Sequence, residues 1–264
     1  MKPGLSNLFL TGRPKREMLR FIENCSGECK VWELVDDGSL KLDEKTIGRL
    51  KELASSYGLE YSVHAPFTDL NIASLNPHIR RISLKMVEAS MQHAYKLEAK
   101  TMVVHPGFKG AQESFRPGEA WRDNIKIFQN LLAKAEKLQL KLAVENMPQG
   151  SWSLLSTVED FKKFFSSDGL EGLGMTLDVG HALTVGQLNS FIEEFKDRIW
   201  HVHIHDNTGD SDKHLGFGEG TLNWPLTVRR LKRNGFSGFL IVESTRRPFE
   251  TFLKVKALIE ELEV

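Results

Sequence analysis

Short apolar runs alternate with longer amphipathic stretches along the whole chain. This pattern is typical of repeated strand–helix units, in which the strands form a parallel sheet buried between helices. Eight such units are present, and the predicted strands cover residues 5–10, 31–35, 59–64, 100–105, 140–145, 173–178, 199–204 and 239–243. Helices are expected in the segments between them.

The clearest predicted helix lies between the third and fourth strands and begins at Asn76-Pro77. Its apolar residues recur at steps of three and four: Ile79, Ile82, Met86, Val87, Met91 and Ala94. Eight units in 264 residues give about 33 residues per unit, the size expected of a (β/α)8 barrel. Because no linker rich in Pro, Gly or Ser divides the chain, the sequence predicts an α/β fold, a single-domain TIM barrel over residues 1–264. An open doubly wound sheet is the alternative.

Charge and hydropathy exclude several classes of partner. Lys and Arg number 35 and Asp and Glu also number 35, so the net charge gives no general attraction to nucleic acid or acidic membranes. No run approaches the roughly 18 consecutive apolar residues of a membrane-spanning helix, and the start lacks a secretory signal. We expect a cytoplasmic protein without membrane association, and no dedicated protein partner is indicated. Cys25 and Cys29 are expected to be reduced thiols.

Several predicted strands end in a polar residue that follows an apolar run: His64, His105, Glu145, Asp178 and Glu243. In a TIM barrel the carboxyl ends of all strands open onto one face, so these side chains are expected to meet in one pocket. A single histidine here is more simply a core residue bonded to backbone. Five separate buried polar groups are costly without partners, whereas bound cations explain all of them together.

The seventh predicted strand carries His201, His203 and His205, whose spacing of two places all three on one face of the strand. At most one or two of them are needed as metal ligands. Two further pairs extend the cluster beyond one ion, because His181 follows Asp178 by three residues, and Asp212 and His214 lie in a later loop.

These motifs resemble those of the endonuclease IV branch of the xylose isomerase-like TIM barrels, and the likeness spans nearly the whole chain. The motifs occur in the family's order: His64-Ala65-Pro66-Phe67 with Asn71-Ile72-Ala73, Val104-His105-Pro106-Gly107, Val144-Glu145-Asn146, Leu177-Asp178-Val179-Gly180-His181-Ala182, His203-Ile204-His205-Asp206, Asp212-Lys213-His214 and Val242-Glu243.

The resemblance implies three zinc ions and a ligand for each family position. The first ion would be held by His64, His105 and Glu145, with Glu145 bridging to the second. Asp178, His203 and Glu243 would complete the second ion, and the third would be held by His181, Asp212 and His214. His203 matches the family's spacing best; His205 is the reserve choice, and whether His201 contributes stays open.

The same resemblance implies hydrolysis of DNA on the 5′ side of abasic sites. Zinc lowers the pKa of bound water to about 7, which makes hydroxide available as a nucleophile at neutral pH, and a phosphodiester is its natural target. Such a substrate requires basic residues around the site. The candidates for a basic rim are Arg13, Lys15, Arg16, Lys109, Arg116, Arg246 and Arg247, each of which is individually typical of a solvated surface.

Sugar and sugar-phosphate isomerases and epimerases of the same fold are the alternative. The resemblance to them implies a single Mn²⁺, Mg²⁺ or Co²⁺ ion on Glu145, Asp178, His203 and Glu243, with Glu145 and Glu243 as the catalytic pair that moves a proton beside a carbonyl. This alternative gives no reason for His105. Epimerase relatives typically carry Arg where His214 stands, so His214 favours the nuclease. A metal-binding barrel without catalytic activity is a third possibility.

Overall fold

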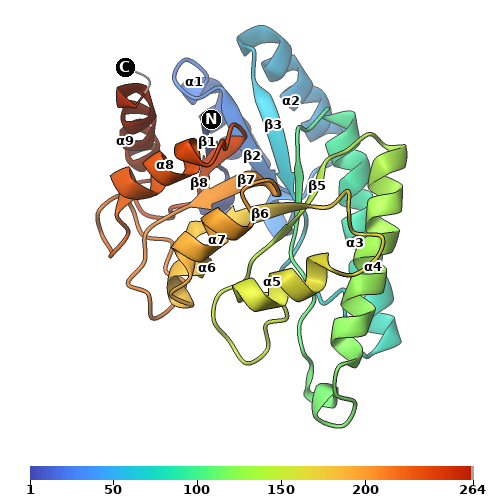
Figure 1. Cartoon of the computed structure of the whole chain (residues 1–264). Coiled ribbons are helices and arrows are strands. Elements are labelled where there is room, and N and C mark those ends of the chain that lie inside the picture. The colour runs from blue at the N-terminus through green and yellow to red at the C-terminus, as the bar shows by residue number, and fades with distance from the viewer. Residues whose placement is uncertain (263–264) are drawn as a thin grey trace.

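Within residues 1–262, which the computed structural model describes, eight parallel strands close into a barrel with helices around it (Figure 1). Each strand pairs with its neighbours in chain order, and β1 pairs with β8 to close the ring. The strands are β1 Lys2–Ser6, β2 Val31–Val35, β3 Glu60–His64, β4 Met102–Val104, β5 Leu142–Glu145, β6 Gly174–Asp178, β7 Ile199–Ile204 and β8 Phe239–Val242. The predicted (β/α)8 barrel is therefore confirmed.

The α-helices follow the strands along the chain. They are α1 Lys15–Cys25, α2 Glu44–Tyr57, α3 Pro77–Lys96, α4 Glu119–Lys137, α5 Val158–Phe165, α6 Val179–Thr184, α7 Leu188–Glu194, α8 Trp224–Arg233 and α9 Pro248–Glu261. Within residues 1–262, three short 3-10 helices, η1 Leu8–Leu10, η2 Gly38–Leu40 and η3 Ala111–Ser114, lie in the connections. Among the described residues, no helix combines the length and apolarity needed to cross a bilayer.

The first predicted strand is wrong in its position. Residues 5–10 were expected to be extended, but β1 covers Lys2–Ser6, and the apolar run Leu8–Leu10 forms η1 instead. Pairing fixes this register, since Lys2 lies opposite Phe239 and Leu5 opposite Val242 of β8. Because β1 ends early, Leu8 lies at the mouth of the barrel, where it lines the central pocket.

Helix α3 begins where the sequence predicts, with Asn76 as its N-cap: its side chain accepts a hydrogen bond from the backbone N–H of His78. The C-terminal part of its apolar stripe, including Met91, is buried against the barrel. The first turns differ from expectation, because Ile79 and Ile82 are 43% and 52% exposed. The apolar stripe of α3 is therefore longer than the part of the helix that packs against the barrel.

The strands separate an apolar outer core from an interior that carries the ionisable side chains. On β2, Trp32 and Leu34 belong to the main hydrophobic core, whereas Glu33 between them is completely buried beside His201 of β7. This alternation follows from the period of two in a strand. The ionisable side chains are thus enclosed by the barrel that carries them.

Both cysteines are free thiols. Cys29 is buried in the hydrophobic core, and this burial raises the pKa of its thiol to about 12. A thiol with so high a pKa is protonated at neutral pH and is a poor nucleophile or metal ligand.

Candidate metal centre

The nine ligands expected from the sequence lie at one end of the barrel because the strands deliver them there. His64, Glu145 and Asp178 are the last residues of β3, β5 and β6. His105 and Glu243 directly follow β4 and β8. The other four come from β7, α6 and the loop after β7: His203, His181, Asp212 and His214. Together with His205 they form three clusters, each with its possible ligand atoms within 4.8 Å of one another.

The first cluster consists of His64, His105 and Glu145. Oε2 of Glu145 lies 3.2 Å from Nε2 of His64 and 3.2 Å from Nε2 of His105. His64 donates its Nδ1–H to the carbonyl oxygen of Ala65 at 2.8 Å, which leaves Nε2 free to face the carboxylate. Three protein ligands with one open position are the arrangement of a catalytic zinc site.

The second cluster consists of Glu145, Asp178, His203 and Glu243. Nδ1 of His203 lies 3.3 Å from Glu145 Oε1, 3.4 Å from Glu243 Oε2 and 3.8 Å from Asp178 Oδ2. Three carboxylates therefore converge on one imidazole nitrogen. This donor set, rich in oxygen, suits Mg²⁺, Mn²⁺ or Co²⁺.

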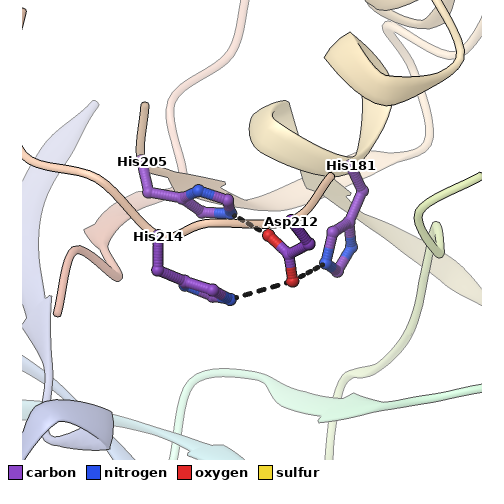
Figure 2. Close-up of side chains that lie close together, drawn as sticks. All are labelled: His181, His205, Asp212 and His214. Atoms are coloured by element: carbon purple, nitrogen blue, oxygen red, sulfur yellow. Dashed lines mark hydrogen bonds and ion pairs between the residues drawn. The ribbon is translucent and has the colours of Figure 1, made fainter. Parts of the chain in front are cut away.

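The third cluster surrounds Asp212 (Figure 2). Oδ2 of Asp212 lies 3.1 Å from Nε2 of His181 and 3.1 Å from Nε2 of His214. His205, the reserve choice for the second ion, groups with this cluster, with its Nε2 3.6 Å from Asp212 Oδ1, and it also lies 3.2 Å from Asp178. Its imidazoles make this cluster the richest in nitrogen of the three.

The electrostatics of the centre fit bound cations. Burial raises the pKa of Glu243 to about 7, assisted by the nearby carboxylates Glu33 and Glu145. Burial acts in the same direction on Glu145, but His203 and His105 hold the pKa of this carboxyl well below its usual range. Several acidic groups thus share a small buried volume, and divalent cations would neutralise the charge that otherwise has to be balanced by protons.

A cavity of about 210 Å³ opens above these clusters. It is lined by Leu8, Val35, His64, Phe67, His105, Glu145, Met147, Pro148, His181, Asp212, His214 and Glu243. Among residues 1–262, no lysine or arginine lines this cavity. Three candidates for a basic rim are instead paired with carboxylates: Lys15 with Asp43, Arg116 with Glu119, and Arg247 with Glu219.

A family model for xylose isomerase-like TIM barrels matches residues 26–263. The chain belongs to this family. An uncharacterised protein of Methanocaldococcus jannaschii is 33% identical, over 99% of this chain and 89% of that protein. A probable endonuclease 4 of Mycobacterium leprae is 25% identical over 70% of this chain and 73% of its own length.

Among solved structures, this xylose isomerase-like barrel is similar to a D-tagatose 3-epimerase-like protein, with a TM-score of 0.89 and 32% identity over 99% of this chain and 96% of that chain. A 3-keto-D-glucoside 4-epimerase of E. coli has the same fold, with a TM-score of 0.78 and 18% identity over 99% of both chains. The relatives thus include proteins named for both candidate activities, so membership of the family does not distinguish them.

Two residues that sequence reasoning missed support the centre of this xylose isomerase-like barrel. Glu33 lies beneath the second cluster, with its two oxygens 2.8 Å from Nε2 of His201 and 3.0 Å from Nε2 of His203. Asn146 fixes the end of β6, since its side chain donates to the carbonyl of Asp178 at 3.0 Å and accepts from its N–H at 2.7 Å. A lone charged residue within the apolar segment Val31–Val35 was the available signal for Glu33.

Proposed function

We propose that this protein is a divalent-metal-dependent isomerase or epimerase of a small, uncharged sugar. The observation that carries the proposal is the cavity of about 210 Å³, which lies over the second cluster and has no lysine or arginine among its lining residues within the described chain. Pockets for drug-sized ligands occupy about 300–1,000 Å³. This smaller cavity therefore suits a compact molecule with few atoms.

The walls of the cavity suit the two faces of a sugar. Leu8, Val35, Phe67 and Met147 provide apolar surface, while the histidines and carboxylates provide hydrogen-bond partners. A phosphodiester or a sugar phosphate instead requires cationic side chains that neutralise its charge. Once the histidines serve as metal ligands, the positive charge inside this cavity would come from the bound metal ions.

Glu145 and Glu243 are the two groups that would exchange protons with the substrate. They come from β5 and β8, and both approach Nδ1 of His203, at 3.3 and 3.4 Å. Glu145 is held ionised by its histidine neighbours, as a base requires, whereas the pKa of Glu243 is raised to about 7, near the optimum for proton transfer at neutral pH. One glutamate would remove the proton beside the carbonyl and the other would return a proton.

A divalent ion on Glu145, Asp178, His203 and Glu243 would polarise the substrate carbonyl as a Lewis acid. Polarisation makes the adjacent C–H bond more acidic, so a carboxylate of ordinary strength suffices as the base. The likeness to the D-tagatose 3-epimerase-like protein, at 32% identity over 99% of this chain, supports this assignment.

Solvent exchange tests the proposal directly. The protein is loaded with Mn²⁺ or Co²⁺, incubated with a panel of ketoses in D₂O, and examined by NMR for deuterium at the carbon beside the carbonyl. We expect incorporation with at least one ketose, and we expect both Glu145→Gln and Glu243→Gln to abolish it. Asp210→Asn, an exposed loop variant outside the clusters, is the control and should exchange at the normal rate. Absence of exchange with every ketose would contradict the proposal.

Metal-dependent phosphodiester hydrolysis is the second candidate, and one observation favours it. His105 and His214, which the isomerase chemistry does not require, both line the cavity, and each belongs to a cluster able to hold a metal ion. In this case purified protein would carry about three zinc ions per chain, an abasic duplex would be nicked, and His105→Ala would abolish nicking. Nicking without any sugar exchange would establish the hydrolase and reject the isomerase.

A further inference from the structure

We propose that His181, His205, Asp212 and His214 hold one zinc ion in a closed site with four protein ligands, distinct from the second cluster, and that this ion fastens the loop after β7 to the barrel. The expected three-ligand arrangement leaves one position open for substrate. The fourth ligand, His205, removes that position. This ion is not the one at the second cluster, where the proposed isomerase chemistry takes place.

The four side chains converge from three parts of the fold (Figure 2). His181 lies on α6, His205 directly follows β7, and Asp212 and His214 lie in the loop between β7 and α8. Nε2 of His181 and Nε2 of His214 each lie 3.1 Å from Oδ2 of Asp212, and Nε2 of His205 lies 3.6 Å from Oδ1. The four possible ligand atoms are all within 4.8 Å of one another.

Each imidazole is oriented by a backbone carbonyl on its other nitrogen. Nδ1 of His181 donates to the carbonyl of Asn146 at 2.7 Å, and Nδ1 of His214 donates to that of Glu243 at 2.9 Å. His205 faces the carbonyl of Asp206 at 3.4 Å. These contacts leave the Nε2 lone pair of each ring directed at the common centre, which is how metal-binding histidines are held in proteins.

His205 closes the site from the buried side. It is completely buried and does not line the cavity, whereas the other three residues do. Its place depends on Gly180, because a Cβ atom there would lie 1.9 Å from Cε1 of His205. The ring also stacks on His214, with centroids 4.0 Å apart. The absence of a side chain at Gly180 therefore leaves room for the His205 ring between Gly180 and His214.

His205 also lies 3.2 Å from Asp178, so one alternative role is to orient that carboxylate. The donor set argues for the metal. Zinc takes imidazole nitrogens and carboxylate oxygens as ligands in tetrahedral geometry, and closed four-ligand sites are structural, while catalytic sites keep an open position. The oxygen-rich second cluster would bind a different, exchangeable ion.

The ion would hold the loop that follows β7 in its conformation. Asp206 and Leu215 pair through two backbone hydrogen bonds of 3.0 and 2.8 Å, which closes residues 207–214 into a projecting loop. His214, at the end of this loop, has φ +46°, a left-handed conformation that costs energy in a residue other than glycine. A bond from His214 to zinc would hold this conformation and keep the loop over the cavity.

Metal retention is the first test. Protein loaded with zinc and manganese is dialysed against a chelator, and the metals are counted. We expect one zinc per chain to resist removal while manganese is lost. His205→Asn and His205→Gln should each lower the affinity for this zinc about tenfold or more. Asp210→Asn, a variant of the same loop, should retain the zinc. Glutamine keeps an N–H donor for Asp178, so unchanged zinc retention in His205→Gln would overturn the proposal.

Spectroscopy of the unaltered protein gives a second test that does not depend on the variants folding. One equivalent of Co²⁺ added to metal-free protein in the presence of excess Mn²⁺, which occupies the oxygen-rich second cluster, should produce the intense visible absorption of a tetrahedral site. Because the site has no open position, inorganic phosphate should leave that spectrum unchanged. A weak spectrum typical of higher coordination, or a shift on adding phosphate, would contradict closure.

Proteolysis tests the role of the ion in the loop. Lys213 stands between two of the ligands and its side chain is 38% exposed, so it is accessible to trypsin. We expect cleavage after Lys213 to be slow in zinc-loaded protein and at least tenfold faster in metal-free protein and in His205→Gln. Equal cleavage rates with and without zinc would show that the ion does not fasten the loop.

Discussion

Oε1 of Glu33 lies 3.0 Å from Nε2 of His203, on the side of the ring opposite the three carboxylates that approach Nδ1. The negative charge of Glu33 thereby favours a proton on Nε2 of His203, without an aligned hydrogen bond between the two atoms, and leaves Nδ1 for a metal ion. Outer carboxylates of this kind typically contribute 10- to 100-fold to metal affinity.

Glu33→Gln should therefore weaken metal binding at the second cluster by about 10- to 100-fold. The measurement is competition with a metal-sensitive dye, at a metal concentration where the third cluster is already filled. Thr176→Val is a matched control, because Thr176 is equally buried and its hydroxyl has no partner among the described residues. Equal affinities of Glu33→Gln and the unaltered protein would show that His203 does not need Glu33.

Two helical glycines should respond in opposite directions to the same substitution. Gly180→Ala places a methyl group 1.9 Å from the His205 ring, and such overpacking costs about 1–3 kcal/mol of stability. In Gly48→Ala on α2 the new methyl meets no atom within 4 Å among the described residues. That variant should gain about 0.5–1 kcal/mol, because alanine loses less backbone entropy than glycine in a helix. Urea denaturation of both variants measures whether the free energy of unfolding falls in Gly180→Ala and rises in Gly48→Ala.

Asp43 caps α2 and should contribute stability that depends on pH. Its side chain accepts hydrogen bonds from Lys15 at 2.6 Å and from the backbone N–H of Thr46 at 2.8 Å, and these bonds hold its pKa below the usual range. Asp43→Ala should cost about 1 kcal/mol at pH 7. Because the folded pKa is lowered, the difference should shrink as the pH falls below about 4. A difference that persists unchanged at pH 2 would exclude the charge as its source.

Metal removal should make the protein sensitive to alkali. Burial opposes a charge on His181, but Asp178 and Asp212 raise its pKa to about 10, and Asp212 raises the pKa of His214 to about 9. A raised folded pKa stabilises the protein below the unfolded value of about 6.5, and this stability is lost as the pH rises through 9 to 10. The melting temperature of chelated protein should fall over this range by more than that of loaded protein. Parallel curves would contradict the prediction.

The sequence was sufficient to predict the barrel and the meeting of distant side chains at one rim. Both follow from the alternation of strands and helices, since His64, Glu145 and Asp178 each end a strand and parallel strands end on the same face. The start of the barrel was less predictable. Leu8–Leu10 is as apolar as a strand, and only its pairing partners reveal that β1 stops at Ser6.

How deep each histidine of β7, and His205 directly after it, lies in the barrel could not be read from the sequence. His201, His203 and His205 share one face, but each step of two residues moves about 6.6 Å along a strand. The three rings therefore lie at different depths in the barrel. His201 lies beside Glu33, His203 beside the carboxylates of the second cluster, and His205 beside Asp212. Which level each ring reaches depends on the register between β7 and its neighbours, which no local pattern encodes.

The pairing of acids with imidazoles also sets an order of assembly. Glu33, Glu145 and Asp212 each face at least two histidines, so hydrogen ions on those rings can balance the carboxylates while no metal is present. Small zinc modules, in contrast, remain unfolded until they bind metal. A newly synthesised chain of this kind would fold its barrel first and bind metal afterwards. The histidines would then release their protons as the ions enter a cavity that is already formed.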